Sequence, residues 1–235
     1  MSLWPMDQKT KEGSYPPQQY YPDPNASSLP PYPGYPQPAS GNPLYPPQPY
    51  HTQSPTRSLK VDFTSWTARH LGITDAENPG ASIFTVDLHN RKPQMEFKSG
   101  TTDASFATVR YRSWKPEIDI HLHGRDINLR VKTRLKHETT YASIAFPNTY
   151  LTWRSTSALK YLDFECIDQN GVAVATFKPH SSLSMRKLGQ LNIIVPSACS
   201  GVAMDELVLT GVAFMYYVYL QYISASTAAA SASVA

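Results

Sequence analysis

Cysteine is scarce in this sequence: only Cys166 and Cys199 occur among 235 residues, and neither belongs to a CxxC pair. Two thiols are too few for a disulfide framework, so we expect both to be free in a reducing compartment. The first 13 residues contain no apolar stretch of the kind found in secretory signals. Together these absences predict a cytoplasmic protein.

Motifs of the common enzyme classes are also missing. The sequence has no GxSxG nucleophile turn, no P-loop, no GxGxxG and no HExxH. We therefore expect a binding protein without enzymatic activity or a cofactor. His121 and His123 would place two imidazoles on one strand face, followed by Asp126, but His137 and His180 have no supporting ligands around them. The sequence thus predicts no metal site.

The first 57 residues contain almost no Val, Ile or Leu, but hold 15 of the 21 prolines and 7 of the 15 tyrosines. Such a segment cannot bury enough apolar surface to offset its chain entropy, so we predict that residues 1–57 are disordered. Repeated Tyr-Pro units favour a locally extended chain. The segment lacks PPxY and the flanking Arg of typical SH3 ligands, which favours a linker or a weak recruiter of proline-recognition domains.

From residue 58 the sequence changes to short alternating segments separated by turn residues, which is typical of strands. Asn170-Gly171 is the clearest hairpin turn, because it supplies the positive φ values that such turns need. A short helix is expected at 67–71. The predicted strands are 59–66, 82–88, 94–99, 105–113, 118–123, 127–135, 140–146, 149–155, 160–167, 172–178 and 188–195. This spacing predicts an antiparallel sandwich or barrel.

The segment 205–224 breaks the strand pattern, since no residue from Leu207 to Ile223 is charged. It could be a membrane anchor near the lower length limit, two further strands, or a helix buried on all sides. Asp205 and Glu206 at its start suit a helix N-terminus and oppose an anchor, whose cytoplasmic flank should be basic. We favour the buried helix, which a closed barrel of many strands can enclose. Residues 226–235 are expected to form a disordered Ala/Ser tail.

This order of elements resembles the tubby C-terminal-like superfamily of tubby proteins, phospholipid scramblases and LURP-one-related proteins. Among its members, fungal proteins with a tubby-like domain of unknown function are the most similar. The resemblance rests on Thr152-Trp153-Arg154, on the strand 162–167 with the turn 168–171, and on the segment 205–211. It implies an all-β fold at 58–225, a closed antiparallel β-barrel of about 12 strands around a central hydrophobic C-terminal helix. It also implies phosphoinositide binding, while the lack of an acidic loop argues against a scramblase-type calcium site.

Basic residues are concentrated in one part of the chain, with eight Lys or Arg against three acids between Ala104 and Lys136. Because side chains alternate along a strand, the basic residues of 130–136 should share one face, and those of 110–112 should repeat the pattern. Such a surface could bind anionic lipid headgroups or only keep the sheet soluble. The predicted lipid-binding residues are Arg110, Arg112, Arg130, Lys132, Arg134 and Lys136.

Other functions are less favoured by the sequence. Nucleic-acid binding is not expected, since exposed aromatic residues do not interleave with the basic ones. Trp66, Trp114 and Trp153 are expected to be packing residues near strand ends. We therefore expect a monomeric protein that binds membranes peripherally, with a protein-interaction module acting through the tail, or a tail-anchored protein, as the alternatives.

Overall fold

The computed structural model describes residues 56–65, 67–133, 136–157, 162–180 and 187–232. Twelve strands precede a short 3-10 helix, η1, and a long α-helix, α1. The predicted disordered tail lies outside the described residues as far as residue 55. The elements are β1 (Arg57–Phe63), β2 (His70–Asp75), β3 (Ser82–Leu88), β4 (Met95–Ser99), β5 (Ser105–Tyr111), β6 (Glu117–Leu122), β7 (Arg125–Arg130), β8 (Glu138–Ala142), β9 (Tyr150–Ser155), β10 (Phe164–Ile167), β11 (Ala173–Pro179), β12 (Lys187–Ile193), η1 (Pro196–Ala198) and α1 (Gly201–Ala232).

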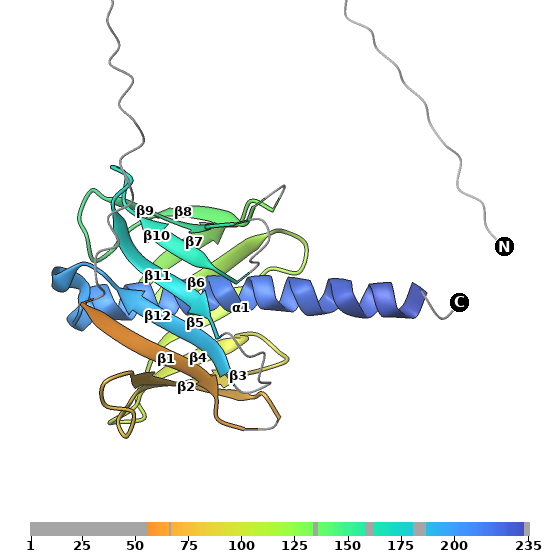
Figure 1. Cartoon of the computed structure of the whole chain (residues 1–235), viewed down its shortest axis with the longest axis horizontal. Helices are drawn as coiled ribbons and strands as arrows, with labels where there is room; N and C mark the ends of the chain where they lie inside the picture. Colours follow the sequence, from red (N-terminus) through yellow and green to blue (C-terminus); the bar gives the residue numbers. More distant parts are fainter. Residues whose placement is uncertain (1–55, 66, 134–135, 158–161, 181–186, 233–235) are drawn as a thin grey trace, which may run out of the picture. The chain divides into compact units, whose positions relative to one another are not determined.

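The strands form one antiparallel sheet in the order β7-β6-β5-β4-β3-β2-β1-β12-β11-β10-β9-β8. The two end strands, β7 and β8, meet where Lys132 and Glu138 exchange backbone hydrogen bonds of 2.7 and 3.1 Å. The sheet is therefore a nearly closed barrel, and α1 runs through it (Figure 1). The predicted fold, a barrel of about twelve strands around a hydrophobic C-terminal helix, is confirmed.

The alternating strand pattern arises because one face of each strand points into the barrel. In β6, for example, Ile118, Ile120 and Leu122 are buried, and the residues between them face outward. The β6–β7 connection has only two residues, His123 at φ 47° and Gly124 at φ 77°. Positive φ at both positions is the two-residue hairpin geometry that matches strand twist.

The helix α1 fills the barrel, and its side chains are mostly buried between Met204 and Val218. Gly211 allows close packing, because an added Cβ would lie 2.8 Å from the Trp153 ring. The hydroxyl of Tyr111 donates a 3.1 Å hydrogen bond to the carbonyl oxygen of Ala213. By length and composition the helix could cross a membrane, but most of its apolar span is enclosed by the barrel. Of the three alternatives for this segment, the buried helix is confirmed.

Three predicted elements were wrong in extent or type. The expected short helix at 67–71 is absent: residues 67–69 belong to the β1–β2 connection and β2 begins at His70, with Gly72 weakening the strand pattern. The predicted strand 127–135 ends at Arg130. The helix begins before residue 205 and continues past 224, so that residues 226–232, predicted to be disordered, are helical. Ala and Ser carry no charge or ring that could mark the helix end, and Ala favours helix.

Candidate functional site

The connections between strands alternate between the two ends of the barrel, because neighbouring strands are antiparallel. We call the end at which α1 begins the entry end and the end at which it emerges the exit end (Figure 1). The entry-end connections are 76–81, 100–104, 123–124, 143–149, 168–172 and 194–200. The exit-end connections are 64–69, 89–94, 112–116, 131–137, 156–163 and 180–186, and the structure describes only part of several of them.

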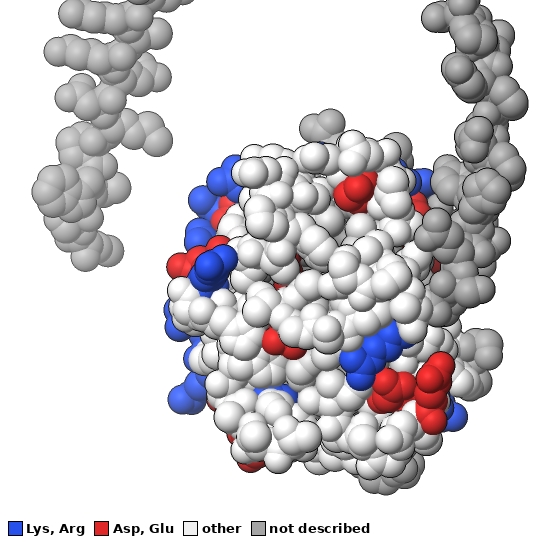
Figure 2. All heavy atoms as spheres, turned by 90° about the vertical axis from the view of Figure 1, so that its left-hand side faces the viewer, with Lys and Arg blue, Asp and Glu red and all other residues white. Residues whose placement is uncertain are grey.

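Charge is segregated between these connections. The described residues of the exit-end connections include one acid, Asp163, and seven basic residues, Arg69, Arg91, Lys92, Arg112, Lys115, Lys132 and Lys136. The six entry-end connections contain Glu77, Asp103 and Asp168 but no Lys or Arg. Figure 2, which looks onto the entry end, shows a mainly uncharged surface. The positive excess of the chain is therefore concentrated where the helix leaves the barrel.

The five predicted lipid-binding residues that the structure describes lie near the exit end of the barrel. Arg110 is on β5, Arg112 directly follows it, and Arg130 ends β7. The strand β6 lies between β5 and β7, so the two basic segments are close but not adjacent. Lys132 and Lys136 lie in the β7–β8 connection, and Arg134 lies outside the described residues.

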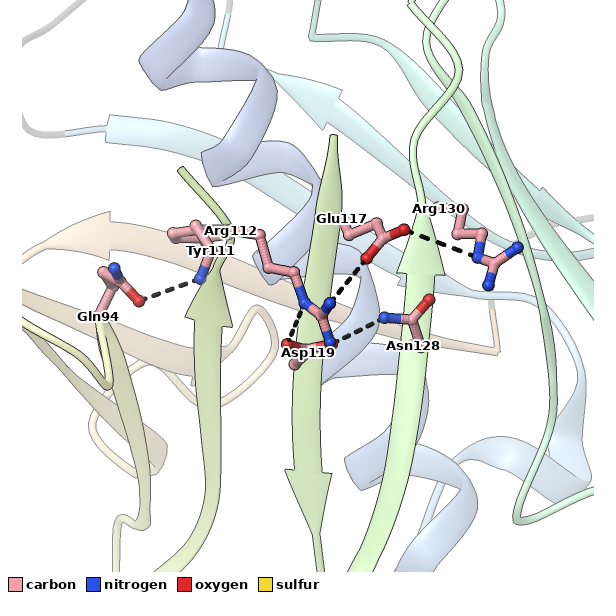
Figure 3. Close-up of polar contacts among 7 residues, drawn as sticks. All are labelled: Gln94, Tyr111, Arg112, Glu117, Asp119, Asn128 and Arg130. Carbon is pink, nitrogen blue, oxygen red and sulfur yellow. Dashed lines mark hydrogen bonds and ion pairs between the residues drawn. The ribbon is translucent and has the colours of Figure 1, made fainter. Parts of the chain in front are cut away.

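The strand β6 contributes carboxylates that neutralise part of this basic surface (Figure 3). The guanidinium of Arg112 contacts Asp119 at 2.7 and 3.2 Å and Glu117 at 3.2 Å. The Asn128 amide donates a further 2.7 Å hydrogen bond to Asp119. The hydrogen bond from Arg112 holds the pKa of Asp119 below its ordinary value, although desolvation opposes the shift. Asp119 is therefore ionised at neutral pH, and an anionic ligand must compete with it for Arg112.

Two further predicted residues are also paired. Arg130 lies 3.8 Å from Glu117, and Lys132 lies 3.0 Å from Glu138. Arg110 and Lys136 are exposed and form no ion pair with any carboxylate that the structure describes. Neighbouring carboxylates therefore offset several of the predicted lipid-binding cations.

An open hollow of about 500 Å³ adjoins the β7–β8 connection at the exit end. Lys132, Thr133, Lys136 and Glu138 line it. Two ammonium groups and a hydroxyl can donate hydrogen bonds to a phosphate, while Glu138 already accepts one from Lys132. The hollow therefore offers a partly compensated site for an anionic group.

Trp114 was wrongly expected to be a packing residue. It lies in the β5–β6 connection with 97% of its surface exposed, whereas Trp153 is fully buried, as predicted. Trp66 lies outside the described residues. Trp114 stands between Arg112 and Lys115, and this pairing of an aromatic residue with cations was visible in the sequence. Its exposure was not, because a Trp beside a strand end is more often buried.

The two histidines do not form a metal site. His121 points outward and lies 2.8 Å from Asp126, while His123 is in the hairpin turn, stacks on Phe106 and lies 2.8 Å from Asp205. The turn separates them, so the expectation of two imidazoles on one strand face was wrong. No group of three potential ligands occurs within the described part of the chain.

Glu206, near the start of α1, is the one fully buried carboxylate among the described residues. It connects α1 to the β8–β9 connection at the entry end. Its Oε2 accepts hydrogen bonds from the backbone N–H groups of Ile144 and Ala145, at 3.0 and 2.7 Å. Its Oε1 has no hydrogen-bond partner among the residues that the structure describes. Burial raises the pKa of Glu206 above its ordinary value of 4.5, although hydrogen bonds from Ser143, Ala145 and other donors oppose the shift. The group holds the β8–β9 connection against α1.

Comparison with protein-family models, curated proteins and solved structures found no match for this chain. The architecture expected from the resemblance to tubby-like proteins is present. Membership of that superfamily stays a prediction, and function has to be argued from the surface itself.

Proposed function

We propose that this chain is a cytoplasmic protein that binds anionic membranes peripherally through the exit end of the barrel. The observation that carries the proposal is the charge segregation: the described residues of the exit-end connections include seven Lys or Arg and one acid, Asp163, whereas the entry-end connections contain three acids and no Lys or Arg. A membrane surface rich in anionic lipid attracts clustered basic residues, each contributing about 1 kcal/mol. Folding does not require such a cluster, since like charges repel one another.

Some of these cations are more available to a lipid headgroup than others. Arg91, Lys92 and Lys115 form no ion pair with a described carboxylate, whereas Arg112 and Lys132 are paired within the protein. These unpaired residues come from the β3–β4 and β5–β6 connections, which are neighbours in the sheet, so they lie close together on one side of the exit end. This arrangement suits a planar anionic surface better than a single enclosed ligand. Phosphoinositides are the preferred lipids because of their high headgroup charge.

A pair of matched double variants tests the proposal. Lys92→Ala with Lys115→Ala removes two charges from the exit end, while Lys60→Ala with Arg125→Ala removes two from the barrel wall and its entry-end edge. Sedimentation with phosphatidylcholine vesicles, with and without a phosphoinositide, measures binding. The exit-end pair should weaken binding by about 2 kcal/mol, roughly thirtyfold. The control pair should stay within a few-fold of the wild type.

Equal binding of the two double variants would overturn the proposal. Tighter binding to single-stranded RNA than to vesicles, with the same dependence on Lys92 and Lys115, would instead indicate a nucleic-acid function. Vesicle binding that is unaffected by salt would also contradict the proposed membrane binding, because exposed charges are screened within about 10 Å at 0.1 M salt.

A further inference from the structure

Apolar side chains are exposed at the same end of the barrel as the basic residues. Trp114 is almost fully exposed, and the helix beyond the barrel exposes Leu220, Tyr222 and Ile223. Apolar side chains that stay in contact with water do not stabilise the fold. Where several large ones are exposed in one region, they mark an interaction site. Their position among cations specifies the kind of partner.

Aromatic rings form a collar where α1 leaves the barrel. Phe63, at the end of β1, contacts Tyr219, and Tyr111, at the end of β5, contacts Tyr216 and Tyr217. We call Phe63, Tyr111, Tyr216, Tyr217 and Tyr219 the aromatic collar. Tyr and Trp are enriched where proteins meet the membrane–water interface, because each has an apolar ring with a polar tip.

The helix continues past the collar for residues 220–232, about 20 Å at the helical rise. Figure 1 shows this segment projecting from the barrel along the helix axis. The sequence from Tyr219 to Ala232 contains no Lys, Arg, Asp or Glu. A helix satisfies its own backbone hydrogen bonds, so an uncharged helical segment can enter hydrocarbon, where unpaired backbone groups cannot.

We propose that Trp114 and the projecting segment of α1 insert into the lipid layer as an apolar anchor, while the surrounding cations contact the headgroups. This inference rests on the proposed function and adds a second contribution to membrane affinity. The occupant is a lipid bilayer because the exposed apolar groups share their end of the barrel with seven described basic residues in the connections, against a single acid, Asp163. The barrel axis would then stand upright on the membrane, with the entry end and Thr56 facing away from it.

Salt separates the two contributions, because it screens charge but does not weaken apolar insertion. At high salt the wild type should retain measurable binding to anionic vesicles. Trp114→Ala should weaken this salt-resistant binding at least about tenfold, and Leu220→Ser with Ile223→Ser should have a similar effect. Matched controls at the entry end are Tyr150→Ala and Val172→Ser with Val202→Ser, which remove exposed apolar groups and should leave binding unchanged.

Tryptophan fluorescence gives a readout that does not depend on affinity. Vesicles with brominated acyl chains quench indole rings that enter the hydrocarbon, so the wild type should be quenched on binding. Trp114→Phe should lose that part of the quenching, while buried Trp153 contributes none. Equal quenching of the two proteins, together with unchanged salt-resistant binding of the serine variant, would overturn the insertion. Sedimentation of the Lys92→Ala, Lys115→Ala double variant would then still show whether the protein binds vesicles through its charges.

Discussion

The two ends of this barrel are built from the same strands but are closed in different ways. At the entry end polar contacts join α1 to the connections: Glu206 accepts backbone hydrogen bonds from 144–145, and His123 contacts Asp205. Arg57 also donates a 2.7 Å hydrogen bond to the carbonyl of Cys199, just before α1. At the exit end Phe63 and Tyr111 pack against tyrosine rings of α1, and cations and Trp114 remain exposed. The polar contacts of the entry end therefore complete the fold, whereas the exposed groups of the exit end are available to a partner.

The largest expected effect is a loss of folding, caused by a charge introduced into α1, the helix that runs between the two ends. Ala213→Arg would place a charge at a fully buried position beside Tyr111, and an unpaired buried charge costs far more than a typical domain stability. We expect no cooperative unfolding transition by circular dichroism. Gln221→Arg, on the exposed part of the same helix, should unfold cooperatively like the wild type. A folded Ala213→Arg variant would mean that the helix can leave the barrel.

Sequence patterns predicted most of this architecture because burial imposes a period on each strand. The predicted segment 82–88 coincides with β3, whose inward residues alternate regularly. The missed strand β2 has buried Leu71, Gly72 and Ile73 in succession, so the period is lost. The helix was recognisable from its uncharged length, but its C-terminal end was not, since the Ala- and Ser-rich sequence after residue 224 contains no Gly or Pro that would mark a helix end.

The candidate site was less accessible to sequence analysis, because charge compensation depends on which strands are neighbours. Alternation correctly placed Arg110 and Arg130 on the outside, but Glu117 and Asp119 became their neighbours only through the order β7-β6-β5. The segregation of charge between the barrel ends is also invisible along the chain. The basic connections are separated in sequence by acidic or uncharged ones, and they come together only when the strands are assembled.

The second-largest expected effect is a loss of stability when the hydrogen bonds of Glu206 at the entry end are removed. Glu206→Ala would leave the N–H group of Ile144 without its acceptor and the N–H group of Ala145 with only its longer, 3.2 Å hydrogen bond to Ser143, and an unsatisfied donor costs about 1–3 kcal/mol. We expect a loss of about 2–3 kcal/mol in the free energy of unfolding, measured in urea. Lys136→Ala at the exit end should change it by less than about 0.5 kcal/mol. Similar losses for both variants would remove the proposed difference between the ends.

The buried carboxylate also makes the entry end sensitive to pH. Because burial raises the pKa of Glu206 in the folded state above 4.5, the folded protein holds this proton more tightly than the unfolded chain. Its contribution to stability is complete below pH 4.5 and is lost as pH rises through the folded-state pKa, with a slope of at most about 1.4 kcal/mol per pH unit. Glu206→Gln keeps an acceptor oxygen but cannot ionise. The stability of the wild type relative to this variant should therefore fall with rising pH, and a constant difference would contradict the raised pKa.

The smallest expected effect is on vesicle binding, and it tests whether the carboxylates of β6 weaken the binding of lipid by the exit-end cations. Asp119→Asn removes the charge that pairs with Arg112, and an exposed pair of this kind contributes about 0.2–1 kcal/mol to stability. The released guanidinium can then contact lipid, so we expect binding to phosphoinositide vesicles to strengthen by up to about fivefold. Asp126→Asn removes a similar exposed charge near the entry end, where it pairs with His121, and should leave vesicle binding unchanged. If both variants strengthen binding equally, net charge governs the interaction; if only Asp119→Asn does, Arg112 is a local contact and the ion pair within the protein competes with lipid.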